Sequence, residues 1–261
     1  MQWSELKLRL CGPAGLAIAS AIAIVLFGVA VSCGNPSTAS TAASSSANAG
    51  TSRSVSFPSE DGITLTGRLF GSGSSGVILA HMYPADQTSW YPTAEKLAGE
   101  GYLVLTFDFR GYRESQGTKQ IEYLHRDVMG AIRELASEGA VRAVLIGASM
   151  GGTACLIAAS TAQAFSQIAV TGVATLSAPI EFNGLSAEKA TPEIQVPLLF
   201  IAAEDDVGAD GARALQDLAA NRGDLQIVPG SDHGTDLLDG QQASKVWDLL
   251  LQFLDENMPP T

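Results

Sequence analysis

Hydrophobic positions along this chain fall into short continuous runs, which alternate with longer segments of mixed apolar and polar character. Continuous short apolar runs are typical of parallel strands that are buried on both faces of a sheet. The longer segments between them carry helical patterns. The alternation predicts a mostly parallel sheet with helices on both faces, an α/β fold. The predicted strands are 77–80, 103–107, 142–146, 172–177, 197–203 and 225–228, and the predicted helices are about 90–100, 121–138, 151–164, 210–221 and 241–256.

The segment before the first buried run has a different pattern. Apolar and polar residues alternate over Val55–Phe57 and again over Ile63–Phe70, and the turn-forming stretch Pro58–Gly62 separates them. Alternation of this kind predicts half-buried strands, so we expect an antiparallel hairpin at one edge of the sheet. Nothing in the middle of the sequence has the composition of a linker. Residues 53–261 are therefore expected to form one domain.

Residues 1–32 are predicted to be a signal peptide. Lys7 and Arg9 precede an uncharged, largely apolar stretch that runs from Cys11 to Ser32. Cys33 follows small residues and precedes a Ser/Thr/Ala tract, and this resembles a bacterial lipoprotein signal in which the cysteine is lipidated and becomes the mature N-terminus. We expect residues 33–52 to form a flexible tether and the protein to be an exported cell-envelope lipoprotein. An uncleaved membrane helix is the alternative, because the apolar stretch approaches the length of a span.

Composition limits the partners and prosthetic groups. The formal net charge of −12 and the absence of a Lys/Arg cluster argue against binding of nucleic acid. The three histidines lie in separate predicted elements, so no metal site is predicted, and no motif indicates a cofactor. Cys11 would be removed with the signal and Cys33 lipidated, which leaves Cys155 without a disulfide partner. Nothing in the sequence indicates an oligomeric state.

The pentapeptide Gly147-Ala-Ser-Met-Gly151 joins a predicted strand to a predicted helix. Glycines two residues before and after Ser149 allow a sharp turn that exposes the serine hydroxyl at the carboxyl end of the strand. The amides at the start of the following helix point toward any negative charge that develops there. The pattern by itself is weak in a glycine-rich chain, so its interpretation depends on a base and an acid elsewhere.

A base and an acid do follow in the expected order. Of the three histidines, only His233 lies late in the chain on a glycine-flanked loop, after the last predicted strand. The acid is expected at the end of the preceding strand, where Glu204, Asp205 and Asp206 follow in a row. Spacing favours Asp206, and Asp205 is the substitute if the strand ends one residue earlier. Serine, acid and histidine in this order are the chain order of one known class of catalytic triad.

With these positions in place, the chain from about Arg53 onward resembles an α/β-hydrolase. The stretches that carry the resemblance are 79–84, 107–117, 147–152, 200–206 and 230–234. The resemblance implies that the backbone N–H groups of Tyr83 and Met150 form an oxyanion hole, with Met82 as an alternative donor. It also implies structural roles for His81 and for Asp108 and Arg110, the latter two as a charged pair that holds its loop. Met82 stands where the family commonly has glycine.

We therefore expect a serine esterase that acts through an acyl-enzyme, with Ser149 as nucleophile, His233 as base and Asp206 as the residue that orients the base. Only residues 178–196 separate the predicted strands 172–177 and 197–203, which is too short for a large cap, so an open site is expected. The substrate would be a small acyl ester or a peptide, and the membrane would be a partner through the lipid anchor.

Other functions remain open on the same residues. A peptidase or amidase would use the same triad, and Glu181 is the weak candidate for binding a substrate ammonium. Thioesterase or haloperoxidase-like chemistry also suits these residues. A non-catalytic, membrane-tethered binding protein on a hydrolase scaffold is a further alternative, because fold similarity carries no substrate information.

Overall fold

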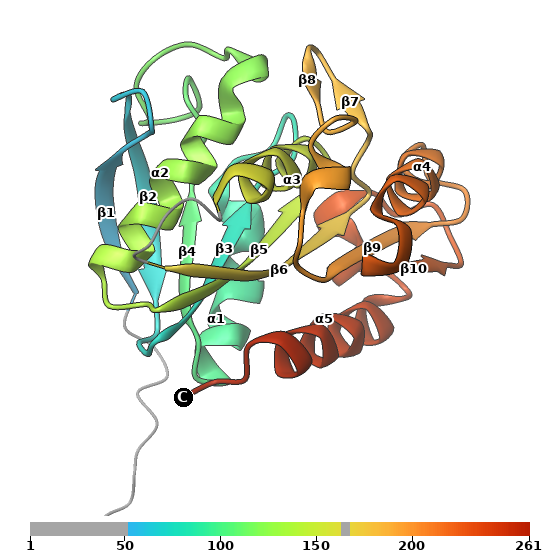
Figure 1. Cartoon of the computed structure of the whole chain (residues 1–261). Helices are drawn as coiled ribbons and strands as arrows, with labels where there is room; N and C mark the ends of the chain where they lie inside the picture. Colours follow the sequence, from blue (N-terminus) through green and yellow to red (C-terminus); the bar gives the residue numbers. More distant parts are fainter. Residues whose placement is uncertain (1–51, 163–167) are drawn as a thin grey trace, which may run out of the picture. The chain divides into compact units, whose positions relative to one another are not determined.

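An eight-stranded sheet organises the part of the chain that the computed structural model describes, residues 52–162 and 168–261 (Figure 1). All of these residues belong to one compact unit, Ser46–Thr261. The predicted signal peptide 1–32, Cys33 and the linker up to residue 51 lie outside the described residues. The last residues of the helix predicted over 151–164 do as well.

The strand order in the sheet is β1-β2-β4-β3-β5-β6-β9-β10. Strands β1 and β2 form the antiparallel hairpin predicted at the edge, and β2 also runs antiparallel to β4. All other neighbours in the sheet are parallel, which confirms the predicted mostly parallel arrangement. The strands are β1 Ser52–Pro58, β2 Thr64–Phe70, β3 Ser75–Ala80, β4 Leu103–Phe107, β5 Arg142–Ala148, β6 Ala169–Leu176, β9 Leu198–Ala203 and β10 Gly223–Val228.

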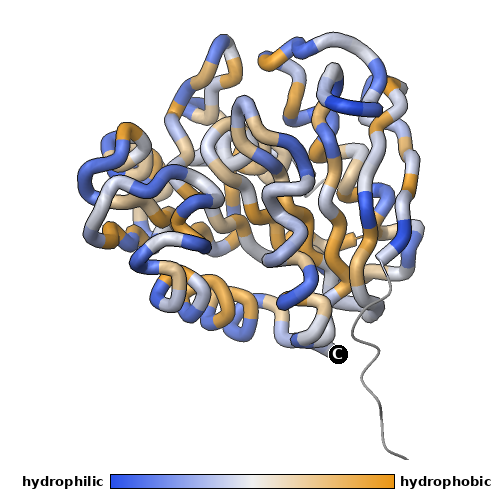
Figure 2. Tube along the Cα trace, turned by 180° about the vertical axis from the view of Figure 1, so that it is seen from behind, coloured by the Kyte–Doolittle hydropathy of each residue, from blue (hydrophilic) through white to orange (hydrophobic). Residues whose placement is uncertain are grey.

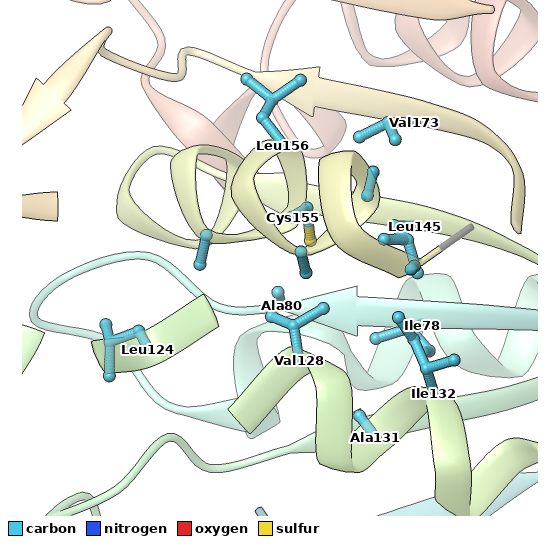
Figure 3. Packing of buried hydrophobic residues seen from close by; sticks show 14 of the residues in the cluster. Ile78, Ala80, Leu124, Val128, Ala131, Ile132, Leu145, Cys155, Leu156 and Val173 are labelled. Carbon is cyan, nitrogen blue, oxygen red and sulfur yellow. The ribbon is translucent and has the colours of Figure 1, made fainter. Parts of the chain in front are cut away.

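The continuous apolar runs are explained by two separate cores, one on each face of the sheet. Along β3, Val77 and Leu79 belong to one core while Ile78 and Ala80 belong to the other, because successive side chains of a strand point to opposite faces. Helices α2, α3 and α4 cover one face, and α1 and α5 cover the opposite face. Figure 3 shows the core that contains Ile78 and Ala80 and is covered by α2, α3 and α4; Cys155 of α3 is buried there as a free thiol.

The five predicted helices are confirmed to within a few residues at each end. Two of them begin with a short 3₁₀ turn, Gln87–Trp90 before α1 and Ile121–Tyr123 before α2. Helix α5 alternates between hydrophobic and hydrophilic residues along its length, as Figure 2 shows, because only one of its sides packs on the sheet. The helices are α1 Tyr91–Gly99, α2 Leu124–Ser137, α3 Met150–Ala162, α4 Ala209–Ala219 and α5 Ala243–Asn257.

The connection between β6 and β9 contains no large cap, as expected. It holds a two-stranded hairpin, β7 Glu181–Phe182 with β8 Leu185–Ser186, and a single 3₁₀ turn, Thr191–Glu193. The hairpin was not predicted from the sequence, because its strands are too short for a periodic signal. In Figure 1 the hairpin projects beyond the carboxyl ends of the parallel strands, beside α3.

Candidate active site

Ser149 occupies a strained turn between β5 and α3. Its φ is +47°, in the left-handed region that side chains other than glycine rarely adopt. Two hydrogen bonds hold it there: its N–H donates to the Leu176 carbonyl at 2.7 Å, and the Gly152 N–H donates to its carbonyl at 2.9 Å. Such strain persists only where the surrounding structure imposes it, and it concentrates at functional sites. The strained turn therefore makes Ser149 a candidate functional residue.

The two flanking glycines are required by close backbone approach. A Cβ on Gly147 would lie 2.4 Å from the Gly151 carbonyl oxygen, inside the turn itself. A Cβ on Gly151 would lie 2.4 Å from the Ala80 carbonyl oxygen, at the end of β3. Both clashes are with backbone atoms that cannot move aside. The glycines thus let the start of α3 pack directly on the end of the neighbouring strand.

His233 and Asp206 are brought together from separate loops. Nδ1 of His233 lies 2.7 Å from Oδ1 of Asp206, and the carboxylate can only accept, so the ring N–H at Nδ1 donates. The Asp206 side chain is 3% exposed and the His233 side chain 31% exposed. With its proton on Nδ1, the neutral imidazole keeps Nε2 free as an acceptor. This is the tautomer that a general base requires.

The adjacent acidic residues are used differently. Glu204 and Asp205 are exposed, and their backbone N–H groups donate to the Val228 and Gly230 carbonyls at 2.8 Å and 2.9 Å. These bonds tie the loop after β9 to the loop after β10. The structure therefore pairs His233 with Asp206 and not with Asp205.

The loop that carries His233 lies against the serine turn. A Cβ on Gly234 would be 3.4 Å from the Ala148 Cβ and 2.5 Å from the Met82 sulfur. Among the described residues, Ser149 Oγ makes no hydrogen bond, so the link from serine to histidine is not closed in this state. Hydrogen bonds of this kind are often long in unliganded enzymes and tighten when substrate binds.

Two backbone N–H groups lie free beside this arrangement. Within the described chain, neither Tyr83 nor Met150 donates its N–H to a protein acceptor. Met150 is the first residue of α3, where helix amides have no partner inside the helix. The N–H of Met82 is also undonated in the described residues, so the alternative donor stays available. These donors are suited to an oxyanion, provided that it forms next to Ser149.

His81 is buried and holds the loop after β3. Its Nδ1 lies 3.0 Å from the Met82 carbonyl, and its Nε2 accepts the Phe109 N–H at 3.2 Å. Burial lowers the pKa of His81 to about 4, so the ring is neutral near pH 7. Both ring nitrogens are occupied, which leaves His81 unable to act as a base.

The expected charged pair of Asp108 and Arg110 does not form. The Asp108 carboxylate accepts hydrogen bonds from the Gln87 N–H at 3.0 Å and from its side-chain amide at 2.6 Å. Arg110 instead binds Asp127 and Asp61. Tertiary packing gives each side chain a partner from another segment: Gln87 lies against Asp108, while the turn before β2 and helix α2 bring Asp61 and Asp127 to Arg110. Each holds the loop, but through partners from elsewhere in the chain.

Three side-chain contacts near the site were not predicted from the sequence. The Met82 sulfur touches the histidine loop and lies 3.8 Å from the Thr235 hydroxyl. Tyr112 is buried, with its hydroxyl 3.9 Å from the Met150 sulfur, and Lys119 lies over the Tyr112 ring. No local sequence pattern predicts these contacts.

Glu181, the weak candidate for binding a substrate ammonium, accepts a hydrogen bond from the Gly184 N–H at 2.8 Å within its own hairpin.

The described residues contain neither a metal-binding cluster nor a membrane-spanning helix. No group of three or more His, Cys, Asp or Glu side chains there could hold a metal ion. None of the helices in that part of the chain is long and apolar enough to cross a bilayer.

Comparison with known proteins concerns the fold. The family model described as alpha/beta hydrolase fold matches residues 77–200. The uncharacterized protein YfhR of Salmonella typhi is 32% identical over 115 residues, 40% of this chain and 39% of that protein. Epoxide hydrolase A of Mycobacterium tuberculosis is 35% identical over 127 residues, 48% of this chain and 35% of that protein. The chain thus spans less than two fifths of the length of these relatives.

Solved structures resemble the fold over most of its length. The Pyrococcus furiosus esterase Pf2001 superposes with a TM-score of 0.68 at 21% identity, covering 80% of this chain and 91% of that one. The esterase domain of a Rhodothermus marinus protein gives a TM-score of 0.61 at 22% identity, covering 79% and 98%. The fold of this chain is therefore the α/β-hydrolase fold.

Proposed function

We propose that this protein is a serine hydrolase that cleaves carboxylic esters. The observation that carries the proposal is the 2.7 Å contact between His233 and Asp206 on a loop that packs against the Ser149 turn. It combines an oriented base with a serine held in a strained turn. The similarity to esterases and to an epoxide hydrolase supports hydrolysis as the reaction class.

The proposed reaction has two halves. His233 Nε2 accepts the Ser149 proton while Oγ attacks the ester carbonyl carbon, and the N–H groups of Tyr83 and Met150 bind the resulting oxyanion. The carbon–oxygen bond to the leaving group then breaks, and His233 gives its proton to the departing alcohol. Water attacks the acyl-serine with His233 again accepting a proton. Release of the carboxylic acid returns the proton to Ser149.

Epoxide opening is not favoured by residue 149. A serine oxygen that opened an epoxide would become an ether of the enzyme, and the site holds no group that would cleave an ether. An ester formed with serine can be hydrolysed by activated water. The similarity to an epoxide hydrolase therefore supports the scaffold and a hydrolytic reaction, but not that substrate.

The peptidase alternative differs in what the site must bind. A protease specific for free amino termini needs a carboxylate for the substrate ammonium, and the Glu181 carboxylate accepts a hydrogen bond from its own hairpin. Ester cleavage needs no such group. We therefore propose esters as the substrates to test first and amides as the substrates to test second.

The test is labelling of the full-length protein with a fluorophosphonate, which forms a covalent bond with an activated serine. We expect one adduct by intact mass, absent from Ser149→Ala and His233→Ala. Ser186→Ala, which changes an exposed serine on β8, is the control and should keep the adduct. An adduct that survives Ser149→Ala, or none on folded wild-type protein, would refute the proposal and favour a binding protein.

We also propose that the enzyme is anchored through lipidated Cys33 in the cell envelope. The charged start, apolar stretch and following cysteine support this. When the wild-type chain is expressed in a bacterial host, it should enter the detergent phase in phase partitioning. Its intact mass should show that residues 1–32 have been removed. Cys33→Ser should abolish lipid labelling. If Cys33→Ser and wild type behave alike and both retain residue 1, the segment acts as an uncleaved membrane helix.

A further inference from the structure

Lys119 holds a positive charge beside the candidate oxyanion hole. It lies in the loop between β4 and α2, and its side chain is exposed. The ammonium is 4.0 Å from the centre of the Tyr112 ring and 5.9 Å from the centre of the Tyr83 ring. A cation over aromatic faces is attracted by their negative π charge. The two tyrosines thus position the ammonium between them.

Both tyrosines belong to the segments that surround Ser149. Tyr112 contacts Met150 through its hydroxyl, and its ring packs edge-on against His81 at 4.7 Å. Tyr83 is one of the two proposed oxyanion donors, and its side chain is 49% exposed. Burial is the main cause of the lowered pKa of His81, and the positive charge of Lys119 lowers this pKa further. Lys119 is therefore fixed to both sides of the proposed oxyanion hole.

The ammonium of Lys119 has no carboxylate partner among the described residues. Arg113 in the same loop pairs with Asp86 at 2.9 Å, and Arg110 pairs with two aspartates. Glu181 of the β7–β8 hairpin accepts from the Gly184 N–H and forms no ion pair with Lys119 among the described residues. In a chain with a formal net charge of −12, an anionic substrate would meet a generally unfavourable field. An unpaired cation at this position offsets that field where the substrate binds.

We propose that Lys119 binds a carboxylate on the substrate, so that the preferred substrates are esters that carry a negative charge. Tyr83 and its neighbour Phe182, whose rings lie 5.7 Å apart, would contact the apolar part of the same substrate. This inference rests on the proposed esterase function and names its substrate class.

The test compares matched charged and neutral esters on the full-length protein. One pair carries the charge on the acyl side, 4-nitrophenyl hemiadipate against 4-nitrophenyl heptanoate. The other carries it on the alcohol side, 4-(butyryloxy)benzoate against phenyl butyrate. The readout is the ratio of kcat/KM for the charged ester to that for the neutral ester. For at least one pair, Lys119→Met should lower this ratio about fivefold, the effect of one partly exposed ion pair.

Three controls make the result specific. Lys119→Arg keeps the charge and should keep most of the ratio. Lys96→Met removes a lysine that lies over the Trp247 ring at 5.3 Å, on α1 outside the site, and should leave the ratio unchanged. Raising the salt concentration should lower the wild-type ratio toward that of Lys119→Met, because salt screens exposed charges.

The outcomes separate the two proposals. If Ser149-dependent ester hydrolysis occurs but Lys119→Met leaves both ratios at the wild-type value, the role of Lys119 is refuted and the esterase function stands. If the wild type cleaves no ester, or cleaves esters equally well as Ser149→Ala, the proposed function fails and the substrate class falls with it.

Discussion

Two groups of charged residues, one around Arg110 in the loop after β4 and one around His233 in the loop after β10, differ in how completely they are bonded. Around Arg110, the guanidinium donates two hydrogen bonds to Asp127 and two to Asp61, and the Arg110 N–H donates to the second oxygen of Asp127 at 2.9 Å. Around His233, one hydrogen bond joins the ring to Asp206. Oδ2 of Asp206 is buried without a hydrogen-bond partner in the described residues.

The difference indicates which group serves the fold. Arg110 and Asp127 are both fully buried, and burial of charges is tolerated only when they are paired and hydrogen-bonded. Four of the five guanidinium N–H groups donate to these carboxylates, so this group is almost fully bonded within the protein. In the candidate site, Ser149 Oγ and the N–H groups of Tyr83 and Met150 are unused. Unsatisfied polar groups cost stability, and they are retained where they meet a substrate.

The largest expected effect is on the candidate site. Asp206→Asn should lower kcat/KM by about 10⁴-fold, because the amide favours the wrong imidazole tautomer and cannot stabilise the imidazolium. The protein should remain folded, since the change is nearly isosteric. The value of kcat/KM is measured with a neutral 4-nitrophenyl ester, and circular dichroism checks that the variant is folded. Asp205→Asn alters an exposed neighbour and should stay close to wild type. The reverse pattern would show that Asp205 is the acid.

The next effect is expected in the Arg110 group, and it concerns folding. Asp127→Ala leaves a buried guanidinium short of a partner and should lower the free energy of unfolding by about 3–5 kcal/mol. Asp210→Ala removes an exposed partner of Arg213 and should cost about 0.5 kcal/mol or less. Urea unfolding followed by tryptophan fluorescence measures both. Equal losses in the two variants would contradict the assignment of the buried group to the fold.

Much of the fold could be predicted because its signals are local. Every buried strand of the main sheet is an apolar run, since alternate residues such as Leu79 and Ala80 enter different cores. Ser149, Asp206 and His233 were selected as candidates because strand ends and chain order identify them. What no local pattern carries are contacts between distant segments. Asp61 lies 49 residues from Arg110, and Gln87 lies 21 residues from Asp108. Such partners are set by tertiary packing alone.

His81 gives a smaller effect that depends on pH. Its pKa is lowered by burial from 6.5 to about 4 in the folded protein. Between these values the unfolded chain binds a proton that the folded chain does not, so stability falls as the pH is lowered from 6.5 toward 4. The full contribution is about 3 kcal/mol. Urea unfolding at several pH values should show a weaker slope in His81→Gln, which keeps a donor and an acceptor. An identical slope would mean that His81 is not the buried group that titrates.

The smallest effect concerns Met82, which follows His81 and contacts the loop that carries His233. Its sulfur lies beneath the histidine loop, 3.8 Å from the Thr235 hydroxyl, and the side chain is only half-buried. Met82→Ala should therefore cost about 1 kcal/mol of stability, below the range for a fully buried methionine. Fluorophosphonate labelling should slow by up to about 10-fold, since the loop that carries His233 loses its support. Met82→Leu conserves volume and should restore most of both. Unchanged labelling in Met82→Ala, together with lower stability, would mean that the loop is held by its bonds to Asp206 and the β9 segment. The position of His233 would then not depend on Met82.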